Sequence, residues 1–359
     1  MELLLQFGNK IKSIREEKNM SQSTLSEKSG LVREQISRIE NGQINATIET
    51  IFKLSLGLDT SMKEIMSFSN ELFTEIKSQD YLKEKPKPFV KWAGGKTQLL
   101  DKIKGRMPEK YNTYYEPFIG GGALLFNITP RNAVINDFNS ELISTYKSFQ
   151  NKKELAKLIE LLKNHENNHS EEYFYKIREM DRVNGFKELS SVEKAARFVY
   201  LNKAGFNGLY RVNKKGQFNV PSGKKLKVNT FDSDNFKKIY EYFSDANISV
   251  LNGDFQEAVS NAQEGDFVYF DPPYDSFDEK ESFTSYSKAG FGREEQFRLS
   301  TVFKELSNRG VKVMLSNHNT KYIQELYKDF NIEIIFAKRM INSKANGRGN
   351  VEEVLITNY

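Results

Sequence analysis

The sequence predicts an α/β protein, in which a doubly wound, Rossmann-like sheet carries a helical insertion and follows an all-α domain. Short apolar runs alternate with amphipathic helical stretches from Phe89 to the C-terminus, a pattern typical of strands joined by crossover helices. Residues 152–247 interrupt this alternation with helical stretches and a strongly basic segment. Residues 1–75 contain only helical patterns, so we expect a separate helical domain there.

The N-terminal region predicts a helix-turn-helix. Ser21 is a good N-cap for a helix over residues 22–28, and Gly30 is suited to end that helix. A short turn leads to a second helix over Arg33–Glu40, and Thr47 caps a further one. Two short helices joined by such a turn form the motif.

Residues 20–26 (MSQSTLS) and 36–42 (ISRIENG) resemble the phage-repressor (Xre/Cro) helix-turn-helix family, with a likeness over roughly residues 6–66. In that family the second helix enters the major groove of DNA. The resemblance implies DNA contacts from four residues, namely Arg33, Glu34 and Arg38 to bases and Gln22 to the backbone. Val32 stands where the family usually has a capping Ser or Thr, which removes a cap worth ~1 kcal/mol. Because the region is slightly acidic, the alternative is a helical bundle that serves only protein contacts.

The domain boundaries follow from the order of the predicted elements. Seven apolar runs predict strands, at residues 113–118, 133–136, 248–251, 267–270, 311–315, 332–336 and 354–357. A helix is expected over Arg293–Asn308, with Phe297, Val302, Phe303 and Leu306 facing inward. The Lys- and Pro-rich stretch before Phe89 favours an extended linker. The predicted domains are residues 1–75 (helix-turn-helix), 76–88 (linker), 89–151 with 248–359 (catalytic sheet domain) and 152–247 (target-recognition insertion).

Composition excludes several classes of chemistry. The 359 residues include no cysteine, so disulfides, thiolate catalysis and Cys-ligated zinc are excluded. The three histidines do not form a metal site, and His165 and His169 lie among asparagines that predict a fraying, solvated helix end. No apolar run approaches the ~20 residues of a membrane span and no signal peptide is visible. We therefore expect a soluble, cytoplasmic protein.

The net charge of +5 is concentrated in one segment. Nine Lys or Arg and no Asp or Glu lie between Lys194 and Phe231, among asparagines, glycines and aromatic residues. Such a segment is typical of a surface that binds a polyanion. A solvated basic face is the alternative, and charge alone does not choose between the two.

Asp271-Pro272-Pro273-Tyr274 follows directly on the apolar run Phe267–Phe270. That run predicts a buried strand, and Pro272 cannot continue it. A carboxylate and a phenol are thus held at the carboxyl edge of the sheet, where open α/β proteins bind ligands. A simple strand-ending turn is the alternative, because Asp and Pro are favoured in turns.

A glycine cluster, residues 120–122, lies between a predicted strand and a predicted helix, where the backbone can approach a ligand closely. Asp137 ends the next strand, a position from which a carboxylate commonly binds the ribose hydroxyls of a nucleoside cofactor. These features alone fit a nicotinamide dinucleotide equally well, although Gly120, Gly121 and Gly122 are contiguous, which is a poor match to the spacing of its fingerprint. Val90 stands where a P-loop needs its first glycine, so ATP binding is not expected.

Six segments in the same order resemble the DNA N6-adenine methyltransferases of the Dam/DpnII type, namely FVKWAGGK (89–96), EPFIGGG (116–122), ND (136–137), NGLYR (207–211), FNVP (218–221) and DPPY (271–274). The likeness covers essentially all of residues 89–359 and implies an enzyme that uses S-adenosylmethionine at GATC in double-stranded DNA, with no metal. The cofactor-binding residues that it implies are Trp92, Lys96, Glu116, Phe118, Gly120, Gly122, Asp137, Asp254, Phe255 and Asp271.

The predicted catalytic residues are Asp271, Pro272 and Tyr274. The adenine N6 amine is a poor nucleophile because its lone pair is delocalised into the ring. Acceptors that draw the amine towards tetrahedral geometry would activate it, and the Asp271 carboxylate and the Pro272 carbonyl are suited to this role. Tyr274 offers a face on which a base flipped out of the duplex can stack.

The basic segment then becomes the predicted DNA-reading element. The resemblance implies that the loop at residues 207–209 enters the duplex near the flipped adenine, and that Lys91 reads the first guanine. The DNA-binding residues predicted in this domain are Lys91, Asn207, Leu209, Arg211, Asn213 and Pro221. Five lysines are expected to contact phosphates, namely Lys214, Lys215, Lys224, Lys225 and Lys227.

The sequence thus predicts a site-specific adenine DNA methyltransferase, acting as a monomer within a restriction-modification system. A cognate restriction endonuclease is a candidate functional partner, but the sequence does not show whether one exists. One alternative is a DNA-binding regulator whose α/β domain senses a nucleotide, and another is a methyltransferase that acts on RNA or protein. The N-terminal domain is expected either to regulate an operon from an operator or only to add affinity for DNA.

Overall fold

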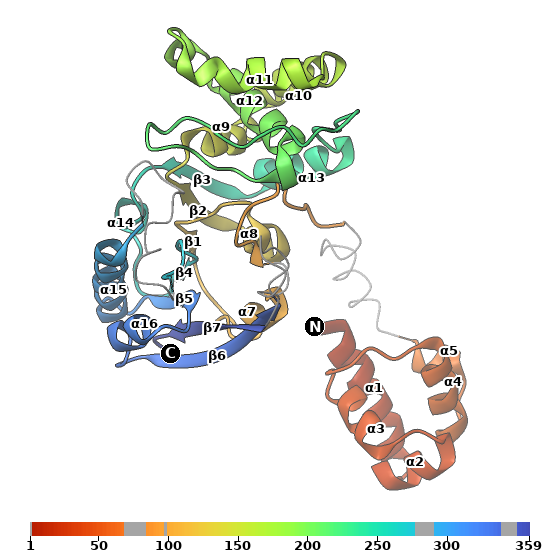
Figure 1. Cartoon of the computed structure of the whole chain (residues 1–359). Helices are drawn as coiled ribbons and strands as arrows, with labels where there is room; N and C mark the ends of the chain where they lie inside the picture. Colours follow the sequence, from red (N-terminus) through yellow and green to blue (C-terminus); the bar gives the residue numbers. More distant parts are fainter. Residues whose placement is uncertain (1, 68–83, 97–98, 277–290, 339–349) are drawn as a thin grey trace. The chain divides into compact units, whose positions relative to one another are not determined.

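The computed structural model describes residues 2–67, 84–96, 99–276, 291–338 and 350–359. It contains two compact units, Met1–Lys83 and Glu84–Tyr359, each of which is considered by itself (Figure 1). A helical first unit and a mixed second unit confirm the predicted fold class. Within the ranges that the structure describes, no helix is long and apolar enough to cross a membrane.

The first unit is a small bundle of helices, α1 (Glu2–Glu17), α2 (Gln22–Ser29), α3 (Arg33–Glu40), α4 (Ile48–Gly57) and α5 (Met62–Ile65). Ser21 caps α2 by accepting a hydrogen bond from the Thr24 amide, and Gly30 ends that helix, both as predicted. Thr47 caps α4 in the same way, by accepting from the Thr50 amide. Helix α3 starts without a side-chain cap because Val32 has no oxygen to offer.

The second unit is built on a seven-stranded sheet in the order β3-β2-β1-β4-β5-β7-β6. The strands are β1 (Tyr114–Glu116), β2 (Asn132–Asp137), β3 (Asn247–Asn252), β4 (Phe267–Phe270), β5 (Lys312–His318), β6 (Asn331–Lys338) and β7 (Asn350–Thr357). Neighbours from β3 to β5 are parallel, whereas β7 pairs antiparallel with both β5 and β6. All seven predicted strands are confirmed, most with ends shifted by a few residues.

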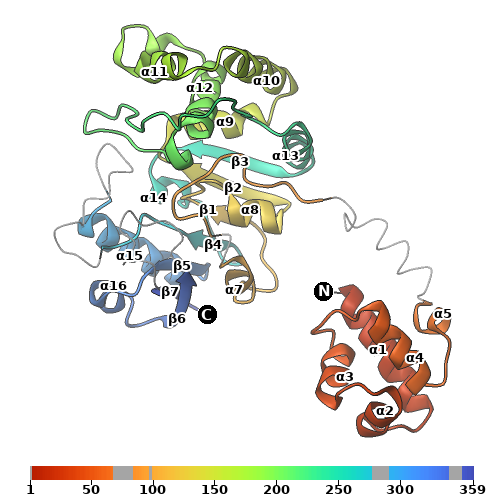
Figure 2. The same cartoon turned by 45° about the vertical axis from the view of Figure 1, so that its right-hand side comes forward.

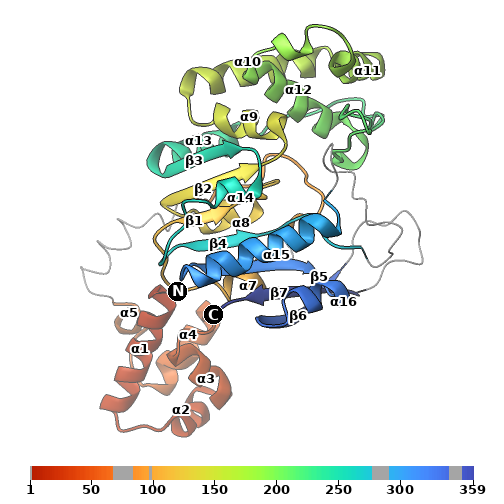
Figure 3. The ribbon, with the colours of Figure 1, turned by 90° about the vertical axis from the view of Figure 1, so that its left-hand side faces the viewer.

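Helices cover both faces of this sheet, as a doubly wound fold requires (Figures 1 and 3). One hydrophobic core includes α7 (Leu100–Lys104), α8 (Ala123–Ile128) and α9 (Ser140–Ser148). The other includes α14 (Phe255–Ala258), α15 (Arg293–Asn308) and α16 (Lys321–Leu326). Neighbouring residues of β1 serve opposite faces, since Tyr114 packs in the first core and Tyr115 in the second.

The prediction for the buried face of α15 is wrong at one residue. Val302, Phe303 and Leu306 are buried as predicted, but Phe297 is 60% exposed. Leu299 marks the true inward stripe, and Phe297 lies two residues from it, about 200° around the helix. An apolar residue at that position therefore faces outward.

Between β2 and β3 the chain builds α10 (Lys152–Asn167), α11 (Glu171–Glu179), α12 (Ser191–Ala204) and α13 (Ser233–Asp245). Helices α10, α11 and α12 lie together above α9 in the views of Figures 1 and 2. Helix α13 packs back against β3. The basic segment runs through α12 and the loops that connect it to α13, so it joins the helical layer to the sheet.

The prediction of a solvated helix end around His165 and His169 is wrong. The Nδ1 atom of His165 lies 2.9 Å from the Tyr173 hydroxyl, and its ring stacks on Tyr200 with centroids 4.8 Å apart. His169 bonds the Tyr200 hydroxyl at 2.8 Å and the Lys225 carbonyl at 3.0 Å. Burial lowers the pKa of His165 to about 4. Aromatic residues from α11 and α12 cover this helix end, which the local sequence of α10 does not indicate.

Candidate active site

A cleft of about 1900 Å³ opens where β1, β2 and β4 reach their carboxyl ends. Segments far apart in the sequence line it, including the Trp92 region, the glycine loop, the DPPY motif and part of the basic segment. The predicted site residues in this lining are Lys91, Trp92, Lys96, Glu116, Phe118, Gly120, Gly122, Asp137, Asn207, Leu209, Asp254, Phe255, Asp271, Pro272 and Tyr274. The fold thus brings predicted cofactor, catalytic and DNA-reading residues to one cavity.

Asp271 lies at the centre of a short polar network. The Lys96 ammonium is 2.7 Å from its Oδ1, and the Ser316 hydroxyl donates to the same oxygen at 3.0 Å. Ser316 in turn lies 2.9 Å from the Tyr269 hydroxyl. Burial raises the pKa of Asp271, while the positive charge of Lys96 opposes that rise. The carboxylate is therefore held in one orientation and its charge is partly compensated.

The side chain of Tyr274 is held in place through its hydroxyl and through its ring. Its hydroxyl donates to Glu353 Oε2 at 2.9 Å, and its ring meets the edge of His318 with centroids 4.9 Å apart. The Lys96 ammonium lies 4.5 Å from the ring centroid, so one face of the ring already has a cation against it. Burial raises the pKa of Tyr274 well above its usual value, which keeps the phenol neutral.

The turn that carries DPPY is held by its neighbours. Gln296 Nε2 donates to the Pro273 carbonyl at 2.8 Å, and Asn317 Nδ2 donates to Gln296 Oε1 at 3.0 Å. Asn317 Oδ1 accepts from the Asp275 amide at 2.9 Å. Strand β5 and helix α15 thus fix the backbone on which the Asp271 and Pro272 oxygens depend.

Glu116 ends β1 and is almost wholly buried, with 3% of its surface exposed. It accepts a hydrogen bond from the Tyr114 hydroxyl at 2.8 Å. Burial raises the pKa of Glu116 to about 8, while the Tyr114 bond acts in the opposite direction. Its side chain is therefore largely protonated at neutral pH and sits in the floor of the cleft.

In the glycine loop, residues 120–122, position 120 must be glycine because a side chain there would collide with Trp92. Gly120 has φ +47, and a Cβ there would lie 2.5 Å from Cδ1 of Trp92. The Tyr146 hydroxyl donates to the Gly120 carbonyl at 2.9 Å. The loop is thus clamped between two aromatic residues before α8 begins.

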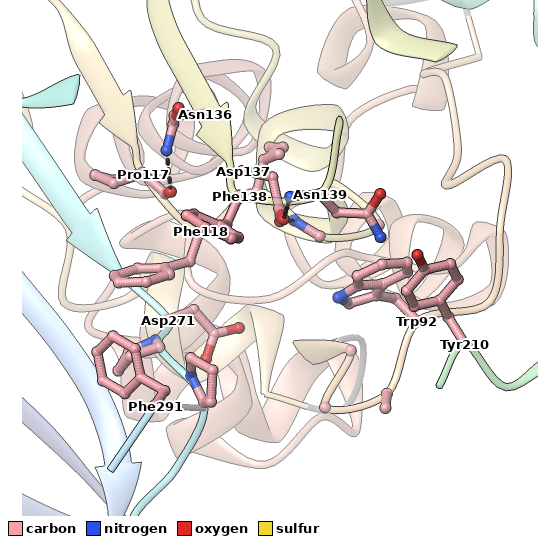
Figure 4. A pocket seen from close by; sticks show the side chains of 18 of the residues that line it. Trp92, Pro117, Phe118, Asn136, Asp137, Phe138, Asn139, Tyr210, Asp271 and Phe291 are labelled. Atoms are coloured by element: carbon pink, nitrogen blue, oxygen red, sulfur yellow. Dashed lines mark hydrogen bonds between the residues drawn. The ribbon is translucent and has the colours of Figure 1, made fainter. Parts of the chain in front are cut away.

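Asp137 joins the glycine loop to the end of β2. Its carboxylate accepts from the Gly120 amide at 3.0 Å and from the Asn139 amide at 2.9 Å (Figure 4). Burial raises the pKa of Asp137 to about 6, while these backbone bonds oppose that rise. A carboxylate oxygen can accept more than one hydrogen bond, so Asp137 retains acceptor capacity towards the cleft.

Three phenylalanines form an aromatic group that lines the same cleft. Phe118 packs on Phe255 with ring centroids 5.3 Å apart and on Phe291 at 5.5 Å. The Arg298 guanidinium lies 4.2 Å from the centroid of the Phe255 ring. It also clamps Asp254, with bonds of 2.8 and 2.6 Å to the two oxygens, and thereby lowers the pKa of Asp254. Asp254 is thus already engaged within the protein.

Two segments at the mouth of the cleft carry the predicted DNA readers. Lys91 and Asn207 are exposed and Leu209 is half-buried, and all three line the cleft. Asn207 has φ +54, which places it in the left-handed region within the 3₁₀ turn at Phe206–Gly208. The turn presents its side chain to solvent.

The remaining predicted readers lie on the adjacent loop. Arg211 is exposed and its Nε donates to Asn219 Oδ1 at 2.8 Å. Asn213 Oδ1 accepts the amides of Lys215 and Gln217, so this side chain shapes a turn. Pro221 is exposed. These three residues lie outside the cleft lining, on the surface that continues from it.

On the first unit, Arg33, Glu34 and Arg38 are exposed along α3. Gln22 has a different environment, because its Nε2 donates to Glu40 Oε2 at 2.8 Å. That carboxylate also forms the buried pair with Arg15, whose Nε lies 2.6 Å from Glu40 Oε1. The Gln22 amide is therefore engaged in holding α2 to α3.

Comparison with known proteins decides the family. A model of the D12 class N6 adenine-specific DNA methyltransferases matches residues 92–341, and a helix-turn-helix model matches residues 11–65. The first match covers more than half of the chain. The chain belongs to the D12 class of N6 adenine-specific DNA methyltransferases. DNA is its substrate, and an N-terminal helix-turn-helix domain precedes the enzyme.

Two Type II methyltransferases that are similar to this chain agree with this assignment. The chain is 50% identical over 273 residues to the Type II methyltransferase M1.LlaDCHI of Lactococcus lactis subsp. cremoris, covering 76% of this chain and 95% of that one. It is 39% identical over 289 residues to the Type II methyltransferase M.MjaIII of Methanocaldococcus jannaschii, covering 76% and 99%. The restriction-modification controller protein C.AhdI from Aeromonas hydrophila is 35% identical, covering 18% of this chain and 100% of that one, with a TM-score of 0.18.

Several residues that line or support the methyltransferase cleft were not predicted from the sequence. Ser316 ends the apolar part of β5, and a polar residue at the carboxyl end of a central strand is a usable signal. Phe138 follows Asp137 directly, is 61% exposed and lines the cleft. Phe291 and Arg298 had no local signal, because their contacts come from tertiary packing.

Proposed function

We propose that this methyltransferase transfers a methyl group from S-adenosylmethionine to the N6 atom of the adenine in GATC, after that adenine has flipped out of the duplex. The observation that carries the proposal is the Asp271 carboxylate, held by Lys96 and Ser316 beside the glycine loop in one cleft. Asn207 and Leu209, from the loop proposed to read DNA, line the same cleft.

The residues of the cleft fit S-adenosylmethionine. Asp137 offers an acceptor for ribose hydroxyls, next to a loop that has no side chain at Gly120 or Gly122. The group of Phe118, Phe255 and Phe291 offers an apolar slot for a flat purine. When bound, the cofactor would supply a methyl group on a positively charged sulfur.

In this proposal the DPPY motif activates the N6 amine of the adenine. The Asp271 carboxylate and the Pro272 carbonyl accept hydrogen bonds from the N6 amine, which draws its lone pair out of conjugation. Once N6 carries the methyl group it must lose a proton, and Asp271, with its raised pKa, is suited to accept it. The ring of Tyr274 provides the stacking surface for the flipped base.

The proposed recognition of GATC depends on the basic segment and Lys91. An Arg or Lys that bonds the N7 and O6 atoms of guanine is the commonest specific contact with DNA. Arg211 and Lys91 are exposed, and Leu209, which is half-buried and packs against the hydrophobic cluster around Tyr200, lies between them in the proposal as the residue nearest the flipped base. The exposed lysines of the same segment would contact phosphates and set the orientation of the duplex.

We further propose that the N-terminal domain binds an operator and regulates a restriction-modification operon. The relatives M1.LlaDCHI and M.MjaIII are Type II methyltransferases, and the helix-turn-helix domain here is an addition to the enzyme. The exposed Arg33 and Arg38 on α3 are suited to base contacts in a major groove.

Replacement of Asp271 tests the proposed chemistry. Asp271→Ala removes the acceptor for the N6 amine, and we expect the rate of methyl transfer to fall by about 10³-fold or more, since preorganised charged groups contribute on that scale. Incorporation of tritiated methyl groups into a GATC duplex measures the rate. Fluorescence of Trp92, the single tryptophan, reports whether the variant still binds the cofactor.

Asp329→Ala is the matched control, since this aspartate is exposed on the surface and contacts only Lys304 among the ion pairs described. It should keep the wild-type rate. Substantial methyl transfer by Asp271→Ala, with cofactor binding intact, would contradict the proposed role.

A further inference from the structure

Asn202 occupies an unusual place on α12, because its side chain is wholly buried and the hydrogen bonds described for it all go to residues outside that helix. Its Oδ1 accepts from the Lys91 amide at 3.1 Å. Its Nδ2 donates to the Lys91 carbonyl at 2.9 Å and to the Gly208 carbonyl at 2.9 Å. One amide group thus bonds the backbones of two segments that both carry proposed DNA readers.

The two segments also touch each other directly. Gly208 has φ +69, and a Cβ at that position would lie 2.7 Å from Cδ of Lys91. Next to Lys91 and two residues after Gly208, the rings of Trp92 and Tyr210 stack with centroids 5.6 Å apart and an angle of 23° between planes (Figure 4). At this junction of the Lys91 and Gly208 segments, the side chains are therefore closely packed, in addition to the backbone hydrogen bonds to Asn202.

A buried amide is well suited to keep such a junction in register. Lys91 lies 111 residues from Asn202 in the sequence, so nothing local holds the two segments together. Any displacement would leave buried N–H and C=O groups without partners, which is costly in a low-dielectric interior. Groups that read base edges need to be held within about 0.5 Å of their working geometry.

We propose that Asn202 is a positioning residue for DNA site recognition, which sets the spacing between Lys91 and the loop at Asn207 and Leu209. It touches no DNA itself, since it is buried. It lets both reading segments reach the same few base pairs. The inference depends on the proposed function, in which these residues read the site.

The decisive variant is Asn202→Asp. It keeps the shape of the side chain and the acceptor for the Lys91 amide, but it replaces the two N–H donors with an oxygen that faces two carbonyls. We expect the ratio of kcat/KM for a GATC duplex to kcat/KM for duplexes with one changed base pair to fall about tenfold or more. The Kd of S-adenosylmethionine should stay within about twofold of wild type.

Two further variants separate positioning from general stability. Ser148→Ala, on α9, removes the hydrogen bond of another wholly buried side chain of the same unit, from its hydroxyl to the Ser144 carbonyl, without touching either reading segment. It should lower the melting temperature but leave site discrimination unchanged. Gly208→Ala disturbs the same junction from the other side and should lower discrimination as Asn202→Asp does.

The proposal is overturned if Asn202→Asp and Gly208→Ala discriminate between sites as well as wild type, whatever their melting temperatures. If Asn202→Asp fails to fold, the site discrimination of Gly208→Ala and Asn202→Ser tests the proposal in the same way. A wild-type preference for a sequence other than GATC would refute the proposed site, and discrimination measured on that sequence would still decide the role of Asn202.

Discussion

At the scale of single residues, the cleft is defined by acids whose protonation depends on burial. Burial raises the pKa of Glu116 to about 8, from a usual value of 4.5. Between these values the folded protein holds a proton that the unfolded chain has released. The Glu116 contribution to stability is therefore full below about pH 4.5 and is lost as pH rises towards 8.

Glu116→Gln tests this pH dependence of stability, because glutamine stays neutral and can still accept a hydrogen bond from Tyr114. Between pH 5 and pH 8 the variant should lose less free energy of unfolding than wild type, by an amount on the order of a few kcal/mol. Urea unfolding followed by Trp92 fluorescence measures the difference. The exposed Glu264→Gln serves as the control, and parallel pH dependence in wild type and Glu116→Gln would refute the assignment.

Motifs that directly follow strands predicted the residues of the site. They placed Asp137 and Asp271 at strand ends, and both line the cleft. They did not predict that Arg298 clamps Asp254, or that Gln22 bonds Glu40. Such partners depend on how distant segments pack, which local patterns do not specify.

At the scale of elements, helix α3 begins without a cap. Val32 has the extended backbone of an N-cap, with φ −70 and ψ 137, and its side chain is 68% exposed. Val32→Ser should satisfy an amide of the first turn and stabilise α3 by ~1 kcal/mol. Hydrogen–deuterium exchange of α3 peptides in the full chain should slow, whereas Val32→Ala, which lacks the oxygen, should give no such protection. Equal exchange in both variants would contradict the prediction.

The strands were the most predictable elements, since their apolar runs are short and bounded. Both ends of β4 are as predicted, and the order of strands and helices gave the doubly wound architecture. The antiparallel insertion of β7 between β5 and β6 was not predicted, because an apolar run does not indicate its partner or direction. The outward position of Phe297 has a similar cause, since one apolar residue does not define the buried stripe of a helix.

At the scale of the whole molecule, two units each present a surface suited to DNA. We expect these surfaces to act on different sequences, an operator for the first unit and the methylation site for the second. Arg38→Ala should weaken protection of the operator about tenfold or more in footprinting and leave methylation of a short GATC duplex unchanged. Asp271→Asn should show the opposite pattern. Loss of both activities in Arg38→Ala, or no protected site upstream of the gene, would contradict regulation by an operator.

The most direct test of the account is to map N6-methyladenine in the DNA of a host that lacks adenine methylation of its own and expresses this chain. Sequencing that detects the modified base should find it at the adenine of GATC on both strands with the wild-type chain and nowhere with Asp271→Ala. Methylation centred on another sequence, or modification that persists with Asp271→Ala, would contradict the account.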